Sequence, residues 1–145
     1  MSTPNITVVE LPEWENISDE GLLQRAQKSA GGWAHFFLAR IGPNEAGLLV
    51  LDLITRPPSA NIREIFVVPG YRRRGIGEGL LAHAEVVARQ RALPTLHLEV
   101  HPLDGDTSRQ FLTQWYGRNG FIAERGHSDK MTKALLDLGG PKGEE

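Results

Sequence analysis

The sequence contains no cysteine among its 145 residues. This absence excludes disulfide bonds, a thiolate nucleophile and any metal site built on cysteine ligands. No apolar run approaches the length needed to cross a membrane. The first residues also lack the basic segment followed by an apolar core that marks a secretory signal. We therefore predict a cytoplasmic protein that has no membrane partner.

An excess of positive charge is also missing. Sixteen Lys and Arg residues stand against 18 Asp and Glu residues, so the formal net charge is −2. Proteins that bind nucleic acid usually carry a basic patch. The one arginine cluster, at residues 72–74, has no aromatic side chains within it that could stack on bases. We expect no nucleic-acid partner.

The length and the pattern of apolar residues predict one domain. A chain of this size can bury a single core, and we place that domain at residues 1–138, followed by a flexible tail at 139–145. Periodicity and turn residues predict the order strand, helix, three strands, helix, strand, helix and two strands. The first helix is expected between Ser18-Asp19 and Gly31-Gly32, with a surface loop later at 56–59. The strands are predicted at 6–11, 33–41, 46–54, 62–68, 95–100, 121–124 and 130–135. The second helix is predicted at 75–91, and the third runs from a cap within Asp106-Thr107-Ser108 to Arg118.

One stretch combines the features of an anion-binding turn. The apolar run from Ile65 to Val68 predicts a buried strand, which Pro69-Gly70 stops. Three arginines, at 72–74, and the spaced glycines Gly75 and Gly77 then lead into the second predicted helix. The first N–H groups of a helix lack intrahelical partners and carry the positive end of its dipole. Because glycine has no Cβ, a phosphate oxygen can approach the backbone here, and we predict a phosphate-bearing ligand.

Two common phosphate-binding patterns do not fit this stretch. A P-loop needs a Lys-Ser or Lys-Thr pair after its second glycine, and the residues around Gly77 offer neither. A Rossmann fingerprint needs G-x-G-x-x-G, whereas Gly79 comes one residue early. Instead, Arg72-x-x-Gly75-x-Gly77 after an apolar strand resembles the signature of the GNAT superfamily of acyl-CoA-dependent N-acyltransferases. In that family the signature turn binds the pyrophosphate of coenzyme A.

A second segment supports the resemblance. The segment Tyr116-Gly117-Arg118-Asn119-Gly120-Phe121 is similar to the family's Tyr-x-x-x-Gly-Phe element. The two motifs lie in the expected order with a strand between them, and the predicted element order resembles the GNAT fold over nearly the whole chain. The resemblance implies an α/β (α+β) fold with a central mixed, mostly antiparallel sheet of about seven strands. It also implies helices on both faces and a splay between the fourth and fifth strands.

The same resemblance implies acetyl-CoA as the co-substrate. Backbone N–H groups from Arg73 to Glu78 would bind its pyrophosphate. In relatives a backbone N–H at the splay stabilises the oxyanion, and this position maps to Val67 or Val68. Because Pro69 interrupts strand pairing there, an N–H without a strand partner is expected nearby. The residues implied to bind the co-substrate are Val67, Val68, Arg72, Arg73, Arg74, Gly75, Ile76, Gly77, Glu78 and Ser108.

One position departs from the family pattern. Relatives usually carry an asparagine seven residues before the tyrosine, where it touches the pantetheine arm. This sequence has Arg109 at that position, with Ser108 beside it as a replacement candidate. The preceding loop, residues 101–107, also looks longer than in relatives. The contact to the pantetheine arm is therefore an open question at this stage.

Acyl transfer from a thioester to an amine also needs an acid for the departing thiolate. Tyr116 occupies the position of the family's acid, four residues before Gly120. A tyrosine with a pKa of about 10 can donate to a thiolate whose acid has a pKa of about 8.5. Helical spacing alone would equally allow Tyr116 to be a core aromatic residue beside Phe111, Leu112 and Trp115.

Two carboxylates are candidates for the base. His97, Glu99 and His101 alternate with apolar residues in the fifth predicted strand, so they share one face, which indicates a wet cleft. The segment Leu98-Glu99-Val100 also resembles the stretch that carries the base in ribosomal-protein alanine acetyltransferases of this superfamily, so Glu99 is the first choice. Glu64, in the fourth strand, is the second, although a merely solvated carboxylate explains it equally well. We interpret the histidines as polar lining of an acceptor groove and predict no metal.

These residues support an N-acetyltransferase that transfers the acetyl group from acetyl-CoA to a primary amine by direct attack in a ternary complex. The alternative is a non-catalytic acyl-CoA-binding module, against which the presence of Tyr116 and Glu99 argues. Relatives bind the acceptor with the first-helix region and the loop between the last two strands. Both are short here, at residues 18–32 and 125–129, which suggests an open groove. A peptide N-terminus, a lysine and a small amine all stay open as acceptors, as does a homodimer.

Overall fold

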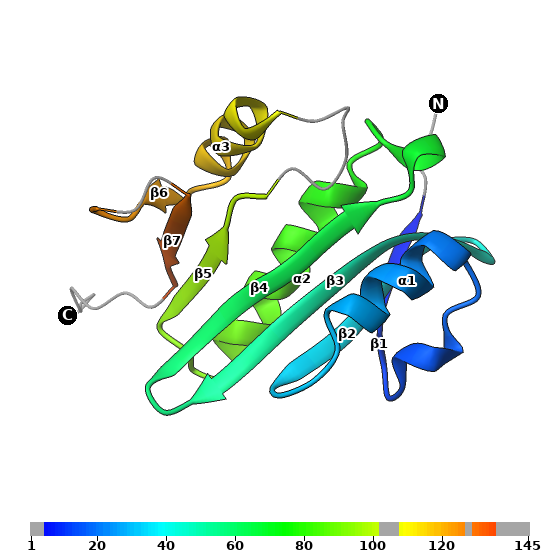
Figure 1. Cartoon of the computed structure of the whole chain (residues 1–145), viewed down its shortest axis with the longest axis horizontal. Helices are drawn as coiled ribbons and strands as arrows, with labels where there is room; N and C mark the ends of the chain where they lie inside the picture. Colours follow the sequence, from blue (N-terminus) through cyan, green and yellow to red (C-terminus); the bar gives the residue numbers. More distant parts are fainter. Residues whose placement is uncertain (1–4, 102–107, 127–128, 136–145) are drawn as a thin grey trace.

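The computed structural model describes residues 5–101, 108–126 and 129–135. The tail predicted at 139–145 and the loop at 102–107 lie outside these ranges. The strands are β1 Ile6–Leu11, β2 Ala34–Ile41, β3 Asn44–Thr55, β4 Pro58–Val67, β5 Thr95–Glu99, β6 Ile122–Ala123 and β7 Lys130–Ala134. The helices are α1 Glu20–Lys28, α2 Ile76–Gln90 and α3 Arg109–Arg118, with 3-10 turns η1 Trp14–Asn16 and η2 Pro69–Tyr71. This element order confirms the one predicted from the sequence (Figure 1).

The strands form one sheet in the order β1-β2-β3-β4-β5-β7-β6. All neighbours are antiparallel except β4 and β5, which are parallel. These two strands pair only where Ala60–Ile62 meets Leu96–Leu98, although β4 continues to Val67. They then diverge, as Figure 1 shows. The predicted mixed sheet with a splay between its fourth and fifth strands is confirmed.

Helices cover the two faces of the sheet, as predicted (Figure 1). On one face, α1 begins where the Asp19 side chain accepts a hydrogen bond from the Leu22 N–H, and it buries Leu22 and Ala26 completely. On the other face, α2 has buried residues at helical spacing, and they join the larger core cluster: Ile76, Leu80, Ala84 and Ala88. No helix in the described part of the chain is both long enough and apolar enough to cross a membrane.

The prediction of a surface loop at residues 56–59 was correct for the exposed turn at 56–57 and wrong for residues 58–59, which belong to β4. Thr55 pairs with Pro58, so β3 and β4 form a hairpin whose turn is Arg56-Pro57, and β4 begins four residues earlier than the Ile62 expected from the sequence. Consecutive prolines predict a loop because each lacks an N–H donor. Here the second proline is the first residue of its strand, where proline is tolerated.

Candidate active site

The N-terminus of α2 has the features of an anion-binding turn. Its N-cap, Gly75, is in the left-handed region at φ 80°, and no side chain caps the helix. Arg73, two residues earlier, is also left-handed at φ 65°. In α2 the first backbone hydrogen bond runs from the Gly79 N–H to the carbonyl of Gly75, the N-cap. The N–H groups of residues 76–78 therefore have no intrahelical acceptor. The turn therefore presents backbone N–H groups at the positive end of α2.

The three arginines beside this turn have different surroundings. The Arg72 Nε donates to the Val67 carbonyl at 2.9 Å, and its guanidinium lies 5.2 Å from the centre of the Phe66 ring. The Arg74 guanidinium lies 5.5 Å from the centre of the Tyr71 ring. Arg73 is exposed. The arginines thus do not form one uniform basic cluster, which could not be seen from their adjacency in the sequence.

Gly77 is in close contact with α3. A Cβ at this position would lie 3.1 Å from the Trp115 ring, closer than side chains normally pack. The Trp115 indole N–H also donates to the Glu78 carboxylate at 3.1 Å. Packing of α3 against α2 therefore favours a glycine at 77 whether or not a phosphate binds there. The sequence analysis placed Trp115 only among core aromatic residues and missed this contact.

The two candidate oxyanion donors, the N–H groups of Val67 and Val68 at the end of β4, point in different directions. The Val68 N–H donates to the Ala46 carbonyl at 2.8 Å, on the β3 side. In an antiparallel pair, N–H groups alternate between the two edges of a strand. The Val67 N–H therefore points away from β3 and towards the gap where the described part of β5 no longer pairs with β4.

Tyr116 is both a core residue and part of a cavity wall. It is 6% exposed, and its ring packs edge-on against Trp115 and Phe121, with ring centres 5.1 and 5.8 Å away. Burial raises the pKa of Tyr116 to about 12, so the phenol is protonated at neutral pH. Its side chain borders the small cavity between β4 and β5. The two interpretations of Tyr116 from the sequence are thus compatible.

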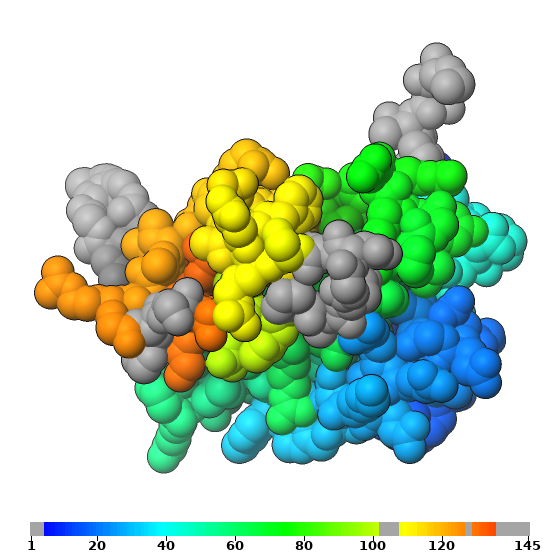
Figure 2. Space-filling model, turned by 45° about the horizontal axis from the view of Figure 1, so that its top comes forward, coloured from blue at the N-terminus to red at the C-terminus, as the bar shows by residue number. Residues whose placement is uncertain are grey.

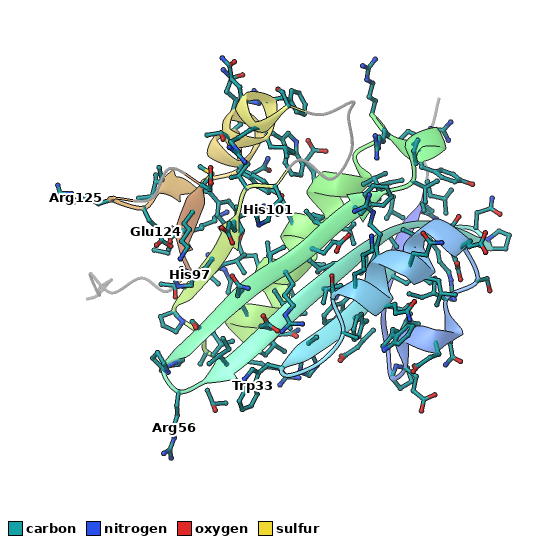
Figure 3. The ribbon with its side chains drawn as sticks, viewed as in Figure 1. Trp33, Arg56, His97, His101, Glu124 and Arg125 are labelled. Atoms are coloured by element: carbon teal, nitrogen blue, oxygen red, sulfur yellow. The ribbon has the colours of Figure 1, made fainter. Side chains whose placement is uncertain are left out.

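This cavity brings the candidate acid and both candidate bases together. Its volume is about 30 Å³, and it lies where β4 and β5 diverge. His101 is also in its wall, in the position that Figure 3 labels beside β5. The lining residues are Ile62, Arg63, Glu64, Ile65, Leu98, Glu99, His101 and Tyr116.

The two carboxylates of this cavity are in different environments. The Glu64 side chain is 9% exposed, accepts a hydrogen bond from the Ser29 hydroxyl at 2.7 Å and lies 3.4 Å from an Arg25 nitrogen. The Glu99 side chain is 50% exposed, and its Oε1 lies 3.3 Å from the His101 Nε2. The negative charge of Glu64 is therefore already compensated, whereas Glu99 is accessible from solvent.

His97 belongs to a separate cluster. Its Nδ1 lies 3.1 Å from both the Glu124 carboxylate and the Thr132 hydroxyl, and its Nε2 lies 3.0 Å from the Thr95 hydroxyl. Figure 3 shows His97 and Glu124 close together, apart from His101. His97 thus ties β5 to β6 and β7. In the described ranges, no group of His, Asp and Glu side chains is arranged to bind a metal ion.

Ser108 and Arg109 both make local contacts at the start of α3. The Ser108 hydroxyl is the N-cap and accepts from the Phe111 N–H at 3.0 Å. The Arg109 Nε lies 3.4 Å from the Asp129 carboxylate, and the Asp129 carbonyl accepts from the Val100 N–H at 2.7 Å. Arg109 therefore connects α3 with the segment that precedes β7. In Figure 2, α3 (yellow) lies on the same face of the molecule as the α2 turn (green).

A larger hollow of about 610 Å³ lies elsewhere, at the start of α1, and contains none of the candidate acid or base residues. The Glu45 carboxylate in its wall accepts hydrogen bonds from the Ser18 and Asp19 N–H groups. Its lining residues are Ser18, Asp19, Arg40, Gly42, Pro43, Asn44, Glu45, Val68 and Tyr71.

Several solved structures share this fold. The ribosomal-protein-S18-alanine N-acetyltransferase from Escherichia coli aligns with a TM-score of 0.69 at 17% identity, over 94% of this chain and 98% of its own. An IAA acetyltransferase from Bacillus cereus aligns with a TM-score of 0.64 at 22% identity, over 90% and 100% of the two chains. Ard1 from Thermoplasma volcanium aligns with a TM-score of 0.64 at 16% identity, over 91% and 99%. At these identities the likeness concerns the fold.

The sequence itself provides the evidence for the family. No relative is detected among curated protein sequences. A family model described as the acetyltransferase (GNAT) family matches residues 5–117, which is more than half of the chain. The matched segment contains the α2 turn, both candidate bases and Tyr116. The chain therefore belongs to the acetyltransferase (GNAT) family of enzymes, as its two sequence motifs predicted.

Proposed function

We propose that the protein transfers an acetyl group from acetyl-CoA to a primary amine by direct attack within a ternary complex. The observation on which this proposal depends is the cavity where β4 and β5 diverge. Tyr116, Glu64 and Glu99 line that cavity, and the Val67 N–H points towards the same gap. An acid, a base and an oxyanion donor are the groups that aminolysis of a thioester needs.

The α2 turn fits the pyrophosphate of acetyl-CoA. Its N–H groups at residues 76–78 lack intrahelical acceptors, and no side chain caps the helix. A Cβ built on Gly75 would have no atom nearer than 4.0 Å, so the space beside the turn is open. Exposed Arg73 adds a positive charge at the edge of the turn. The bound co-substrate supplies the activated thioester.

We assign the oxyanion position to the Val67 N–H rather than to that of Val68. The Val68 N–H already donates to Ala46, and breaking that bond would uncouple the end of β4 from β3. A fixed backbone donor costs no reorganisation when charge develops on the thioester oxygen.

Tyr116 acts as a hydrogen-bond donor to the leaving sulfur. Burial raises the pKa of Tyr116 to about 12, so the phenol still holds its proton when the C–S bond breaks. Burial in the same cavity also raises the proton affinity of the departing thiolate. As the C–N bond forms and the C–S bond breaks, the departing thiolate accepts a proton from Tyr116, and the phenolate regains one from the proton that the acylated nitrogen gives up.

Glu99 is the preferred base because it is accessible and can take the proton from the incoming ammonium. Glu64 stays the second candidate, since it lines the same cavity but is already bonded to Ser29 and paired with Arg25. The acceptor's identity, a homodimer, the absence of a nucleic-acid partner and the cytoplasmic location stay predictions.

The proposal is tested by thiol release from acetyl-CoA over a panel of amines, with acetyl-CoA binding measured by calorimetry. We expect thiol release with at least one amine. Tyr116→Phe should lower kcat by about two orders of magnitude while acetyl-CoA still binds. Tyr71→Phe is the matched control and should behave as wild type. Binding of acetyl-CoA without thiol release from any amine would identify a non-catalytic acyl-CoA-binding module instead.

A further inference from the structure

A β-bulge places Arg63 beside Glu64 on the face of the sheet that α1 covers. Ile62 pairs with Leu51 and Glu64 pairs with Val50, so Arg63 is the extra residue on β4. At a bulge the side-chain alternation of the strand is interrupted. Arg63 and Glu64 consequently both reach Ser29 after the end of α1, instead of pointing to opposite faces.

The Arg63 guanidinium is held in one orientation with part of its donor capacity unused. Its Nε donates to the Asp52 carboxylate at 3.0 Å, and its Nη1 donates to the Ser29 carbonyl at 2.6 Å. Asp52 is only 7% exposed, and its other partner is the Asn61 amide at 3.3 Å. Arginine has five N–H donors, so two bonds leave three N–H groups without a partner among the described residues. The side chain is 32% exposed and lines the cavity that contains Tyr116.

A positive and a negative side chain lie next to each other in the wall of the cavity, and each is already paired with an opposite charge: Arg63 with Asp52, and Glu64 with Arg25. Ser29 bonds to both: its carbonyl accepts from Arg63, and its hydroxyl donates to Glu64. Glu99 adds a second, accessible carboxylate across the gap. A molecule that carries an ammonium group and a carboxylate a few bonds apart is complementary to this arrangement.

We propose that the acceptor is a small amino acid whose carboxylate binds Arg63 while its amine enters the cavity near Glu99 and Tyr116. The proposal rests on the N-acetyltransferase function proposed above and adds the class of acceptor. Arg63 is then a specificity-determining residue. Its planar fork suits a carboxylate, and Asp52 and Ser29 limit the side-chain entropy lost on binding.

A polyamine fits this site less well. A second ammonium group in the place of the carboxylate would approach the Arg63 guanidinium, and like charges brought together at a binding site are unfavourable. An uncharged amide or ester of an amino acid would leave the exposed guanidinium hydrogens without an anionic partner. The property to measure is therefore how strongly the enzyme prefers acceptors that carry a negative charge next to the amine.

The first test uses the unmodified protein and compares glycine and alanine with glycinamide and alaninamide as acceptors. The carboxylate makes the neighbouring amine more basic and hence more protonated at neutral pH, so unassisted chemistry favours the amides. We expect the opposite order, with kcat/KM for the acids higher by roughly ten- to a hundredfold, the usual size of a charged hydrogen bond. Amides or simple alkylamines that react as well as the acids, or better, would overturn the proposal and leave the acetyltransferase function intact.

The second test changes the arginine. Arg63→Gln should abolish the preference for acids over amides, mainly through a higher KM for the acids. Arg91→Gln is the matched control, because Arg91 is exposed at the end of α2, which covers the other face of the sheet. Arg63→Lys retains the charge without the planar fork and should retain part of the preference. If Arg63→Gln does not fold, the comparison of acids with amides in the wild type decides the question.

A binding measurement separates failure of this proposal from failure of the proposed function. Glycine at saturating concentration should raise the melting temperature of the wild type without CoA, and glycinamide should not. This shift should disappear in Arg63→Gln. A glycine shift without thiol release from any amine would overturn the acetyltransferase function but support the Arg63 site. Equal shifts with glycine and glycinamide, or no shift with either, would overturn the Arg63 site.

Discussion

The splay divides the sheet into a long arm, β1 to β4, and a short arm, β5 to β7. The two arms are built differently. In β1 to β4 the strands are 6 to 12 residues long, and their side chains pack into clusters on both faces. In the other arm β5 and β7 have 5 residues each and β6 has 2. Polar side chains such as His97 and Glu99 occupy its second face, which no described helix covers in Figure 1.

The carboxylates Glu64 and Glu99 show what this difference means for chemistry. Glu64, on the long arm, is covered by α1 and bonded to Ser29. Glu99, on the short arm, is half exposed, and its Oε1 lies 3.3 Å from the His101 Nε2. The long arm therefore holds groups in fixed positions, including the Val67 N–H, whereas the short arm carries polar groups that solvent can reach, such as Glu99.

The largest expected effect tests the stability of the two arms. Leu48, in β3, is fully buried, so Leu48→Ala should lower the free energy of unfolding by about 2–5 kcal/mol. Leu98, in β5, already borders the small cavity, so Leu98→Ala should cost an amount near the lower end of that range. Urea unfolding followed by circular dichroism measures both. A greater loss in Leu98→Ala would contradict the idea that the long arm is the more tightly packed one.

The next effect separates the two carboxylates. Glu99→Gln should lower kcat by about two orders of magnitude, with acetyl-CoA binding unchanged. Glu64→Gln retains an acceptor for Ser29 and should mainly cost stability, because Arg25 loses a charged partner. Steady-state rates across a pH series distinguish the two. If Glu64→Gln caused the larger loss of kcat, the roles of the two arms in proton transfer would be reversed.

A smaller effect concerns the contact between α2 and α3. Gly79→Ala should stabilise the protein by about 0.5–1 kcal/mol, because alanine is the better helix former and its Cβ would meet no atom within 4 Å. Gly77→Ala should not be stabilised in the same way, because the added Cβ would lie too close to the Trp115 ring. Melting temperatures compare the two variants, and tryptophan fluorescence should change only in Gly77→Ala. Equal stabilisation by both would show that α3 moves freely against α2.

The smallest effect is a pH dependence in the long arm. Burial lowers the pKa of His83, the charge of Glu10 opposes this, and the ring packs edge-on against Phe37 at 5.2 Å. The folded state therefore prefers neutral His83, and its contribution to stability is complete above the unfolded pKa of about 6.5. It is lost as the pH falls from there towards the lowered folded pKa. His83→Gln should show a shallower fall in urea midpoint over this interval, and identical slopes would contradict the assignment.

Local patterns in the sequence were sufficient for the fold. The spacing of Arg72, Gly75 and Gly77 after an apolar strand, and of Tyr116 before Gly120, identified the family. Apolar periodicity and turn residues then predicted the order of the α-helices and strands that the described residues form, although not the 3-10 turns η1 and η2. The hairpin at Thr55 to Pro58 was missed because two prolines predict a loop, and their tolerance depends on which backbone N–H groups the neighbouring strand needs.

The sequence by itself determined the element order, the anion-binding turn and the residue types available for acid and base chemistry, because these follow from spacing along the chain. Only the tertiary structure decided what each of those residues contacts and how accessible it is. It paired Glu64 with Arg25 and left Glu99 accessible, directed the Val67 N–H rather than that of Val68 towards the gap, and placed Trp115 against Gly77. Each of these outcomes depends on contacts between residues far apart in the chain, which burial and hydrogen-bond geometry select and local spacing cannot specify.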